Sequence, residues 1–430
     1  MTAGPDSHIA QAPRETSARQ RPAIDTKPPV WSLGFIGLCI YTFAILTYKL
    51  PVGELGIAVA IFGVLLDRHH HLSIPLAVWL MLAYVLWAFA GTYVSAYPDL
   101  VISRSLDQLK LLIVLWLVVN VLRTKERIRY YSVLVIGCFI LFPVRGALVN
   151  FFTGNTIWGR VVWNFVYSNP NDLAAYCLLA FGVALSVCLS PDVQRLVRLG
   201  AAVAAALLIQ IVLMTQSRGA FLGLLVGMGP AALRAVRTRP TRVLAAIAAA
   251  ILILLVTPNQ VWQRLSGVTK LTSASTIVEA DPEHSAEQRF EIAKVGWRIF
   301  IDHPFAGVGL GAYRIANGKY APELGQRDTH NTYLNLAAEL GVPGLLIWCA
   351  MVGSVFQVRS RVRARNGDSL SGLRLVWLER ATVAFLVAGF FGTYSTISVV
   401  YIALGMLLST AEFGPEPAHP NALRMQPRSQ

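Results

Sequence analysis

Long apolar stretches recur along this chain, separated by short polar loops that are rich in arginine. A helix needs roughly 20 apolar residues to cross a bilayer, and most of these stretches approach that length. The pattern therefore predicts an all-α polytopic membrane protein with about twelve transmembrane helices and both termini on one side. The predicted spans are 30–48, 51–66, 72–94, 106–122, 130–149, 171–190, 196–214, 219–236, 242–257, 341–358, 374–396 and 398–412.

Composition agrees with this pattern. The 430 residues are 55% hydrophobic and only 14% charged, whereas soluble domains carry about 25% charged residues. Residues 1–29 and 413–430 are polar and contain no apolar core, so we expect disordered tails and no cleavable signal peptide at the N-terminus. The five cysteines lie in apolar segments without CxxC spacing, which predicts packing residues rather than disulfides or a zinc site.

The arginines show which loops share a side of the membrane. The loops on the side of the termini read "DRHHH", "RTKERIR", "PDVQRLVR", "RAVRTRPTR" and "RSRVRARNGDSLSGLR". The positive-inside rule then makes both termini cytoplasmic, and the net charge of +14 is mainly a topology signal rather than a sign of nucleic-acid binding. One large external loop, residues 258–340, separates nine predicted spans at 30–257 from three at 341–412.

Within the external loop, residues 285–302 predict an amphipathic helix. Ser285 and Gln288 form a capping-box pattern at its start, and Asp302 to Pro304 end it. One face carries Phe290, Ala293, Trp297 and Phe300; the other mainly carries Glu287, Glu291, Lys294 and Arg298. We therefore expect this helix to lie on the membrane surface. The following "GVGLG" is expected to be a flexible turn. It is not read as a dinucleotide-binding motif, since no strand precedes it.

Three external residues are candidates for chemistry, each with a simpler alternative. Arg218 in "TQSRGAFLG" is either a functional cation or an arginine snorkelling at a helix end. Arg289 falls in the first turn of the amphipathic helix, where anions are favoured, although a lone surface arginine is usually solvated. His330 in "DTHNTY" is either a catalytic base or a hydrogen-bonded loop residue, and precedes a helix predicted from about Asn331 to Leu340.

The sequence leaves the roles of other polar residues open. Glu339 is either a partner for an arginine or a buried polar group near the bilayer edge. Asn171 follows Asn169 and Pro170 in a pattern typical of a helix cap. Arg160 is another external cation near the membrane, and Arg145 falls within an apolar segment, where a charge is costly and indicates function by default.

These residues suit an anionic, lipid-linked substrate. The planar guanidinium of arginine binds phosphate oxygens bidentately and stays charged. Histidine can take a proton from an attacking hydroxyl at neutral pH. The loops contain no HExxH, no Cys/His ligand pattern and no DxD-like pair, so the sequence predicts neither a metal site nor a cofactor.

The motifs "TQSRGAFLGLLVG", "HPFAGVGLGAYR", "THNTYLNLAAELGVPGLL" and "SNPNDLAAY" resemble the O-antigen ligase and polymerase superfamily of glycosyltransferase-C type. The resemblance extends over about residues 30–412 and implies a bacterial inner-membrane enzyme whose active site faces the periplasm. It also implies a glycan donor on undecaprenyl pyrophosphate and a lipid A–core acceptor. By resemblance His330 is the base, Arg218 and Arg289 bind the donor pyrophosphate, and transfer inverts the anomeric carbon without a metal. Arg160, in the family's less fixed "R…NPN" region, is assigned to the same pyrophosphate or to the glycan, and Arg145 is assigned to the pyrophosphate.

The resemblance leaves alternatives open. The nearest is an O-antigen or exopolysaccharide polymerase that uses the same donor, and a protein O-oligosaccharyltransferase is another. A transporter of the lipid-linked glycan would place its charges at mid-membrane depth. Most unexplained charges here fall at the external edge instead, with Arg145 as the main exception, which favours surface chemistry over transport.

Overall fold

The computed structural model describes residues 30–48, 50–67, 71–238, 285–366 and 373–409. Within these ranges the chain is all-helical, with one isolated β-bridge between Ile157 and Arg160 and no strand. The first part contains α1 (Leu33–Leu46), α2 (Val52–Leu66), α3 (Leu76–Ala90), α4 (Pro98–Val121), α5 (Lys125–Phe139), α6 (Arg145–Phe152), α7 (Pro170–Cys188), α8 (Arg195–Met214) and α9 (Arg218–Thr238). The second part contains α13 (Ser285–Asp302), α14 (Tyr313–Tyr320), α15 (Thr332–Asn366), α16 (Val376–Ala388) and α17 (Ser398–Ser409).

Several of these helices can cross a membrane by length and composition. Five described stretches qualify: Leu76–Tyr93, Lys125–Phe152, Pro170–Cys188, Arg195–Met214 and Thr332–Ala364. Helices α1, α2 and α17 are apolar but shorter. The predicted helical membrane character is thus confirmed. The count of twelve spans and the large external loop stay predictions, because the expected ninth span, 242–257, and residues 258–284 lie outside the described residues.

Among the helix ends that differ from the sequence prediction, two change which residues form loops and helices near the site. Helix α4 begins at Pro98, eight residues before the expected start at 106. Proline is favoured at the first helical position, so the helix begins in the polar residues that precede the apolar stretch. Its charges remain at the surface, where Lys110 pairs with Glu54 at 2.7 Å. Helix α16 ends at Ala388, so residues 389–396, expected to continue a span, form a loop instead.

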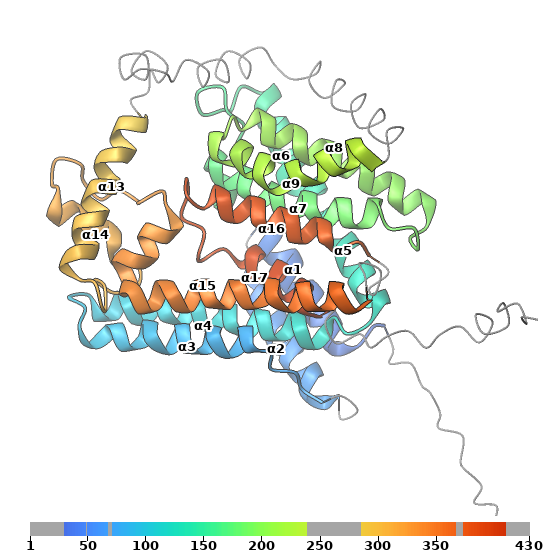
Figure 1. Cartoon of the computed structure of the whole chain (residues 1–430), viewed down its shortest axis with the longest axis horizontal. Helices are drawn as coiled ribbons and strands as arrows, with labels where there is room; N and C mark the ends of the chain where they lie inside the picture. Colours follow the sequence, from blue (N-terminus) through green and yellow to red (C-terminus); the bar gives the residue numbers. More distant parts are fainter. Residues whose placement is uncertain (1–29, 49, 68–70, 239–284, 367–372, 410–430) are drawn as a thin grey trace, which may run out of the picture.

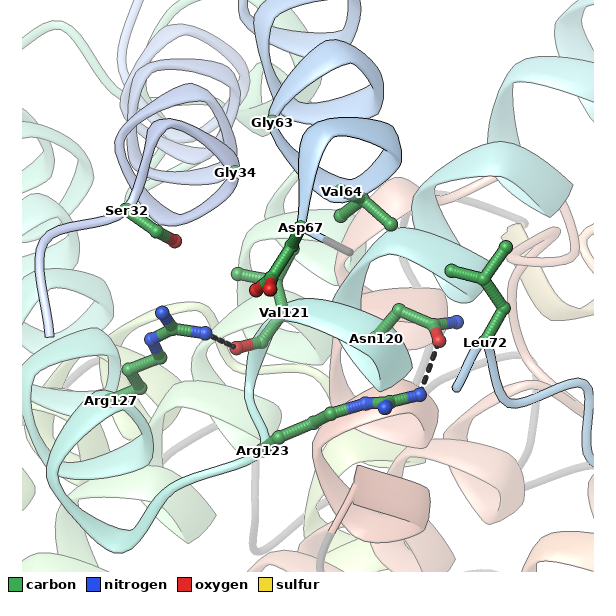
Figure 2. Close-up of a pocket in the computed structure, with 10 residues that line it drawn as sticks. All are labelled: Ser32, Gly34, Gly63, Val64, Asp67, Leu72, Asn120, Val121, Arg123 and Arg127. Carbon is green, nitrogen blue, oxygen red and sulfur yellow. Dashed lines mark hydrogen bonds between the residues drawn. The ribbon is translucent and has the colours of Figure 1, made fainter. Parts of the chain in front are cut away.

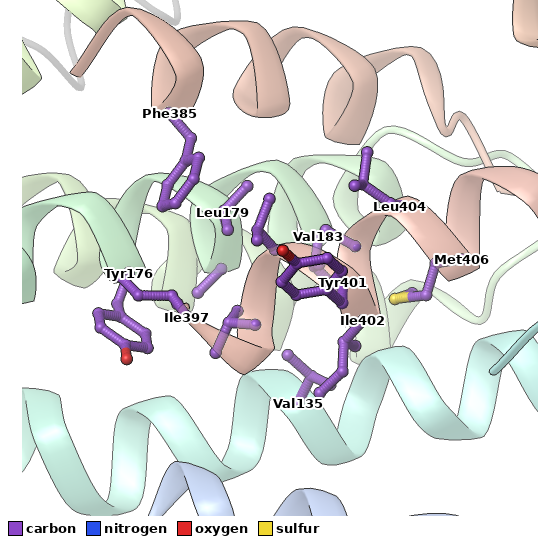
Figure 3. Close-up of a cluster of buried hydrophobic side chains, with 14 of the residues drawn as sticks. Val135, Tyr176, Leu179, Val183, Phe385, Ile397, Tyr401, Ile402, Leu404 and Met406 are labelled. Atoms are coloured by element: carbon purple, nitrogen blue, oxygen red, sulfur yellow. The ribbon is translucent and has the colours of Figure 1, made fainter. Parts of the chain in front are cut away.

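Helix α7 lies at the centre of the bundle. In the most apolar stretch of α7, 78% of the residues are buried, whereas in that of α8, at the periphery, 33% are buried. Tyr176, Leu179 and Val183 of α7 belong to one apolar cluster with Phe385 of α16 and Tyr401 of α17 (Figure 3). The middle of this central helix is therefore packed on several sides.

A kink divides α15. Gly341 has φ +67° inside the helix, and Pro343 follows two residues later. The predicted helix at 331–340 and the predicted span at 341–358 are therefore two sections of one bent element. Figure 1 shows α3 running alongside α15, with α13 and α14 at one end of it.

Candidate functional site

His330 lies at the start of α15 in an unusual backbone conformation. Its φ is +50°, a left-handed value that few non-glycine residues adopt and that costs energy. The neighbouring Asn331 caps the helix, since its Oδ1 accepts hydrogen bonds from the backbone N–H groups of Tyr333 and Leu334 at 3.0 and 3.1 Å. The predicted start of a helix after His330 is confirmed, and the cap fixes where the imidazole can point.

The loop at residues 389–397 joins this helix start to α7. The backbone N–H of Thr332 donates to the carbonyl of Gly389 at 2.8 Å, and its hydroxyl donates to the carbonyl of Gly392 at 2.7 Å. Tyr394 then donates its phenol hydrogen to the carbonyl of Asn171 at 3.1 Å. The N-termini of α15 and α7 are therefore connected through one loop whose role the sequence did not indicate.

Arg160 is buried among backbone and side-chain acceptors. Its side chain is attached to two other elements, with Nε donating to the carbonyl of Thr215 at 2.8 Å and a terminal nitrogen donating to Oδ1 of Asn171 at 2.7 Å. Only 7% of the residue is exposed. These bonds join the 153–169 loop to the C-terminal end of α8 and to the first turn of α7, so Arg160 organises this end of the bundle.

Arg218 is the first residue of α9 and is half-buried. The loop before it contains Thr215, the residue that Arg160 contacts. On its other side, a Cβ at Gly219 would lie only 2.6 Å from the Cβ of Phe391. The structure thus holds Arg218 between the Arg160 contact and the 389–397 loop. Gly219 beside it permits the close packing of α9 against this loop.

Arg289 on α13 lies among titratable groups from two other elements, helix α7 and the loop before α15. Its charge acts on His330, and it also acts on Asp172 in the first turn of α7. Asp328 interacts with both His330 and Asp172. The structure therefore brings two of the predicted site residues, Arg289 and His330, together with two carboxylates that the sequence analysis did not single out.

These surroundings set the protonation of His330. Burial of the imidazole lowers the pKa of His330 below its ordinary value of 6.5, and the positive charges of Arg289, Arg327 and Arg314 lower it further, whereas Asp328 raises it. The net lowering keeps the ring neutral at pH 7. A neutral imidazole has a free lone pair and can accept a proton from a hydroxyl group.

The glycine run after α13 docks on the kink of α15. The kink leaves carbonyl groups without helical partners, and the N–H groups of Val308 and Gly309 donate to the carbonyls of Ala338 and Glu339 at 2.9 Å each. Gly307 has φ +67°, and a Cβ there would lie 2.2 Å from the carbonyl carbon of Glu339. The glycines thus permit tight backbone contact, and the expected flexible turn is instead a fixed one.

Glu339 is a buried polar group and 5% exposed. Its Oε1 accepts a hydrogen bond from the backbone N–H of Tyr313 at 3.2 Å, and the carboxylate also interacts with the N–H of Gly311 and the side chain of Asn335. Of the two interpretations left open by the sequence, the buried one agrees with these contacts. Glu339 attaches the start of α14 to α15.

Helix α13 has the predicted bounds, but its buried face differs from the expected apolar face. Ile292, Val295 and Ile299 pack against α14 and α15. Phe290 and Trp297, which were assigned to the membrane-facing side, are 62% and 55% exposed. The helix therefore has two apolar faces, one packed on the protein and one uncovered.

Arg145 is the first residue of α6 and is exposed. It directly follows a π-helical turn, Ile140–Val144, that contains Pro143. No contact in the described part of the chain connects it to Arg289 or His330. Its assigned role in binding the donor stays a prediction.

A pocket lies at the opposite end of α4 from the loops described above. Figure 2 shows Arg127 donating to the carbonyl of Val121 and Arg123 donating to Asn120, beside Asp67. Helix α4 runs from Pro98 to Val121, and at 1.5 Å per residue this separates the pocket by roughly 35 Å from residues 91–97, where the hydroxyl of Ser95 donates to the carbonyl of Val308 at 2.7 Å. Its arginines satisfy helix-end acceptors, so we do not assign the pocket to the site around His330.

Comparison with known proteins identifies a family for the part of the chain that contains most of these residues. Residues 203–349, which contain Arg218, Arg289, His330 and Glu339, match the family model described as "O-Antigen ligase". A search of curated proteins found no match to the chain. The family match supports a glycosyltransferase-like membrane enzyme that acts on lipid-linked glycans. The resemblance is therefore confirmed over residues 203–349, which match the O-antigen ligase family.

Proposed function

We propose that the protein is an O-antigen ligase of lipopolysaccharide biosynthesis. It transfers a glycan from undecaprenyl pyrophosphate to a sugar hydroxyl of the lipid A–core oligosaccharide. The family match supports the enzyme class, and the grouping of Arg289 with a neutral His330 carries the proposal. A cation for a diphosphate and a base for a hydroxyl are the two groups that this transfer requires.

In the proposed mechanism, Arg218 and Arg289 bind the diphosphate of the donor. His330 takes the proton of the acceptor hydroxyl while its oxygen forms a bond to the anomeric carbon of the donor sugar. The bond from that carbon to the diphosphate oxygen breaks, and the electron pair leaves on the diphosphate. The arginines neutralise this charge as a divalent metal does in other enzymes, and attack opposite the leaving group inverts the anomeric carbon.

Two further arginines have supporting roles in the proposal. Arg160 holds the loop and helix ends around the donor site through its bonds to Thr215 and Asn171. Arg145, exposed on α6, is a peripheral contact for the diphosphate of the arriving donor. The enzyme is proposed to lie in the bacterial inner membrane with this site facing the periplasm, where both lipid-linked substrates would meet.

A polymerase that extends the glycan on its lipid carrier is the second candidate, since it uses the same donor and the same groups. The lipopolysaccharide of a deletion strain separates the two. Loss of a ligase leaves lipid A–core without O-antigen of any length, while finished polymer accumulates on undecaprenyl pyrophosphate. Loss of a polymerase leaves core that carries one repeat unit, and that band on a gel would transfer the assignment to polymerase. Complementation with wild-type and His330→Ala genes supplies the control.

A further inference from the structure

The residues on both sides of His330 are held more tightly than a surface loop requires. The hydroxyl of Thr329 lies 3.3 Å from Oδ1 of Asn335 and 3.2 Å from the hydroxyl of Thr393, and Asn331 caps α15. His330 itself keeps a left-handed φ of +50° between these anchors. Strain of this kind persists only where surrounding contacts impose it, and it is concentrated at functional sites.

Asp328 is part of the same framework. Its Oδ1 accepts a hydrogen bond from the hydroxyl of Thr393 at 2.8 Å. Thr393 belongs to the 389–397 loop, 65 residues away in sequence, so the carboxylate is held by a different element from its own. A carboxylate fixed in this way beside an imidazole resembles the base-and-orienting-group arrangement of other acyl- and group-transfer sites.

The charges around His330 explain why such a group is needed. Arg289 faces it from α13, Arg314 from α14 and Arg327 from its own loop, while Asp328 supplies the negative charge among the described groups that act on it directly. Asp172 of α7 interacts with Arg289 and Asp328, and the uncharged phenol of Tyr394 faces Asp172 and Arg289. An imidazolium formed by proton transfer would therefore meet three arginines and one adjacent acid.

We propose that Asp328, held by Thr393, orients the imidazole of His330 and stabilises its positive charge after it takes the acceptor's proton. Asp328 takes no proton itself and acts as a positioning residue. The proposal rests on the function proposed above, in which His330 is the base. It adds Asp328 and the 389–397 loop to the residues that control the reaction.

The test uses the full chain in nanodiscs with an undecaprenyl-pyrophosphate-linked glycan and lipid A–core. The variants are Asp328→Asn, Thr393→Val and His330→Ala, each measured as kcat and KM against pH. Asp302→Asn is the matched control, because it removes an equal charge from an exposed carboxylate that contacts Tyr320.

Asp328→Asn is expected to lower kcat by about 10²-fold, with the KM for the donor within about threefold. Because Asp328 raises the pKa of His330, its removal should move the acidic limb of the kcat profile to lower pH. Thr393→Val keeps the charge, so it should reduce kcat by less and leave the limb in place. Asp302→Asn should match the wild type in both.

The possible failures are distinguishable. Full activity of His330→Ala would overturn the base assignment and the proposed function with it. An inactive His330→Ala combined with a wild-type kcat and pH profile for Asp328→Asn would overturn only the role of Asp328. A loss of kcat in Asp328→Asn together with a lower Tm and an unmoved acidic limb would assign Asp328 to folding and would also overturn the proposal.

Discussion

Arg160 donates a hydrogen bond to Oδ1 of Asn171 at 2.7 Å and thereby attaches an external loop to the central helix of the bundle. Its Nε makes a second bond, to the carbonyl of Thr215, which lies three residues before Arg218 at the start of α9. Arg160 thus connects α7 with the segment that positions Arg218. The contacts are those of an organising residue, although the sequence had indicated only a cation near the membrane.

Arg160→Ala is therefore expected to lower stability and activity together. Two hydrogen bonds from a charged donor are lost, and the buried Asn171 acceptor is left without its partner, which costs roughly 2–3 kcal/mol. Thermal unfolding in detergent measures the change. Arg145→Ala is the control, since Arg145 is exposed and its removal should change stability by less than about 0.5 kcal/mol. A wild-type Tm with no activity for Arg160→Ala would instead indicate direct contact with the substrate.

Arg289 and His330 are expected to fail in different ways when substituted. His330→Ala should reduce kcat by about 10²–10⁴-fold, the usual contribution of a general base. Arg289→Lys should also lose most activity, because an ammonium does not reproduce bidentate binding of phosphate oxygens. His303→Ala, which alters an exposed histidine outside the site, is the control at matched expression. Near wild-type turnover by Arg289→Lys would show that a point charge suffices there.

The pH dependence follows from the environment of His330. Its pKa lies below the ordinary value of 6.5 because of burial and the nearby arginines. The neutral, active form therefore persists as the pH falls to 6.5, and kcat/KM should decline only at lower pH. An acidic limb that begins above pH 6.5 in the wild type would contradict this assignment. The profile should be taken under conditions in which the protein remains folded.

Gly307 of the docking turn and Gly325 of the loop after α14 differ in whether an added Cβ would meet other atoms. Gly307 and Gly325 have nearly equal φ values, +67° and +69°, but a Cβ at Gly325 would have no atom within 4 Å. Gly325→Ala should therefore cost only the left-handed backbone penalty of roughly 1–2 kcal/mol. Gly307→Ala adds a collision with the backbone of Glu339 and should also make the region around α13 and α14 sensitive to protease. Equal effects of the two substitutions would show that the kink of α15 adapts.

Sequence reasoning predicted the local elements better than their contacts. Apolar run lengths indicated the spans, and the pattern at Ser285 and Asp302 gave both ends of α13, because these signals depend on neighbouring residues. The contact between Asp328 and Thr393 spans 65 residues, and no local pattern encodes it. The same limit explains why the sequence did not show the second apolar face of α13, formed by Ile292, Val295 and Ile299. Periodicity showed apolar positions, but not which of them α14 and α15 would cover.

The proposed orientation in the membrane has a direct test in a variant without native cysteines. Gln326 and Ser360 are both exposed; Gln326 precedes the candidate span Thr332–Ala364, and Ser360 lies near its other end. A membrane-impermeant thiol reagent added to the periplasm should label a cysteine at position 326 immediately. A cysteine at 360 should react only after the inner membrane is permeabilised. The reverse pattern would place His330 in the cytoplasm, away from the proposed acceptor.

The uncovered face of α13 gives the final prediction, on its contact with the lipid surface. Phe290, Trp297 and Ile301 are 62%, 55% and 56% exposed, and their spacing puts them on one side of the helix. Phe305, just beyond the helix, packs on Trp87 of the candidate span α3 with ring centroids 5.6 Å apart. This stripe therefore extends toward a membrane helix, and burying it in the headgroup region removes its apolar area from water.

Spin labels at two adjacent positions test this contact without changing the helix. In the variant without native cysteines, a label at Trp297→Cys should be accessible to oxygen, which concentrates in lipid. A label at the exposed Arg298→Cys, about 100° away around the helix, should be accessible instead to a water-soluble nickel complex. Measurements in nanodiscs and in detergent supply the comparison, since only the bilayer imposes a depth on the helix. Equal nickel accessibility at both positions in nanodiscs would place α13 clear of the membrane and leave its aromatic stripe facing water.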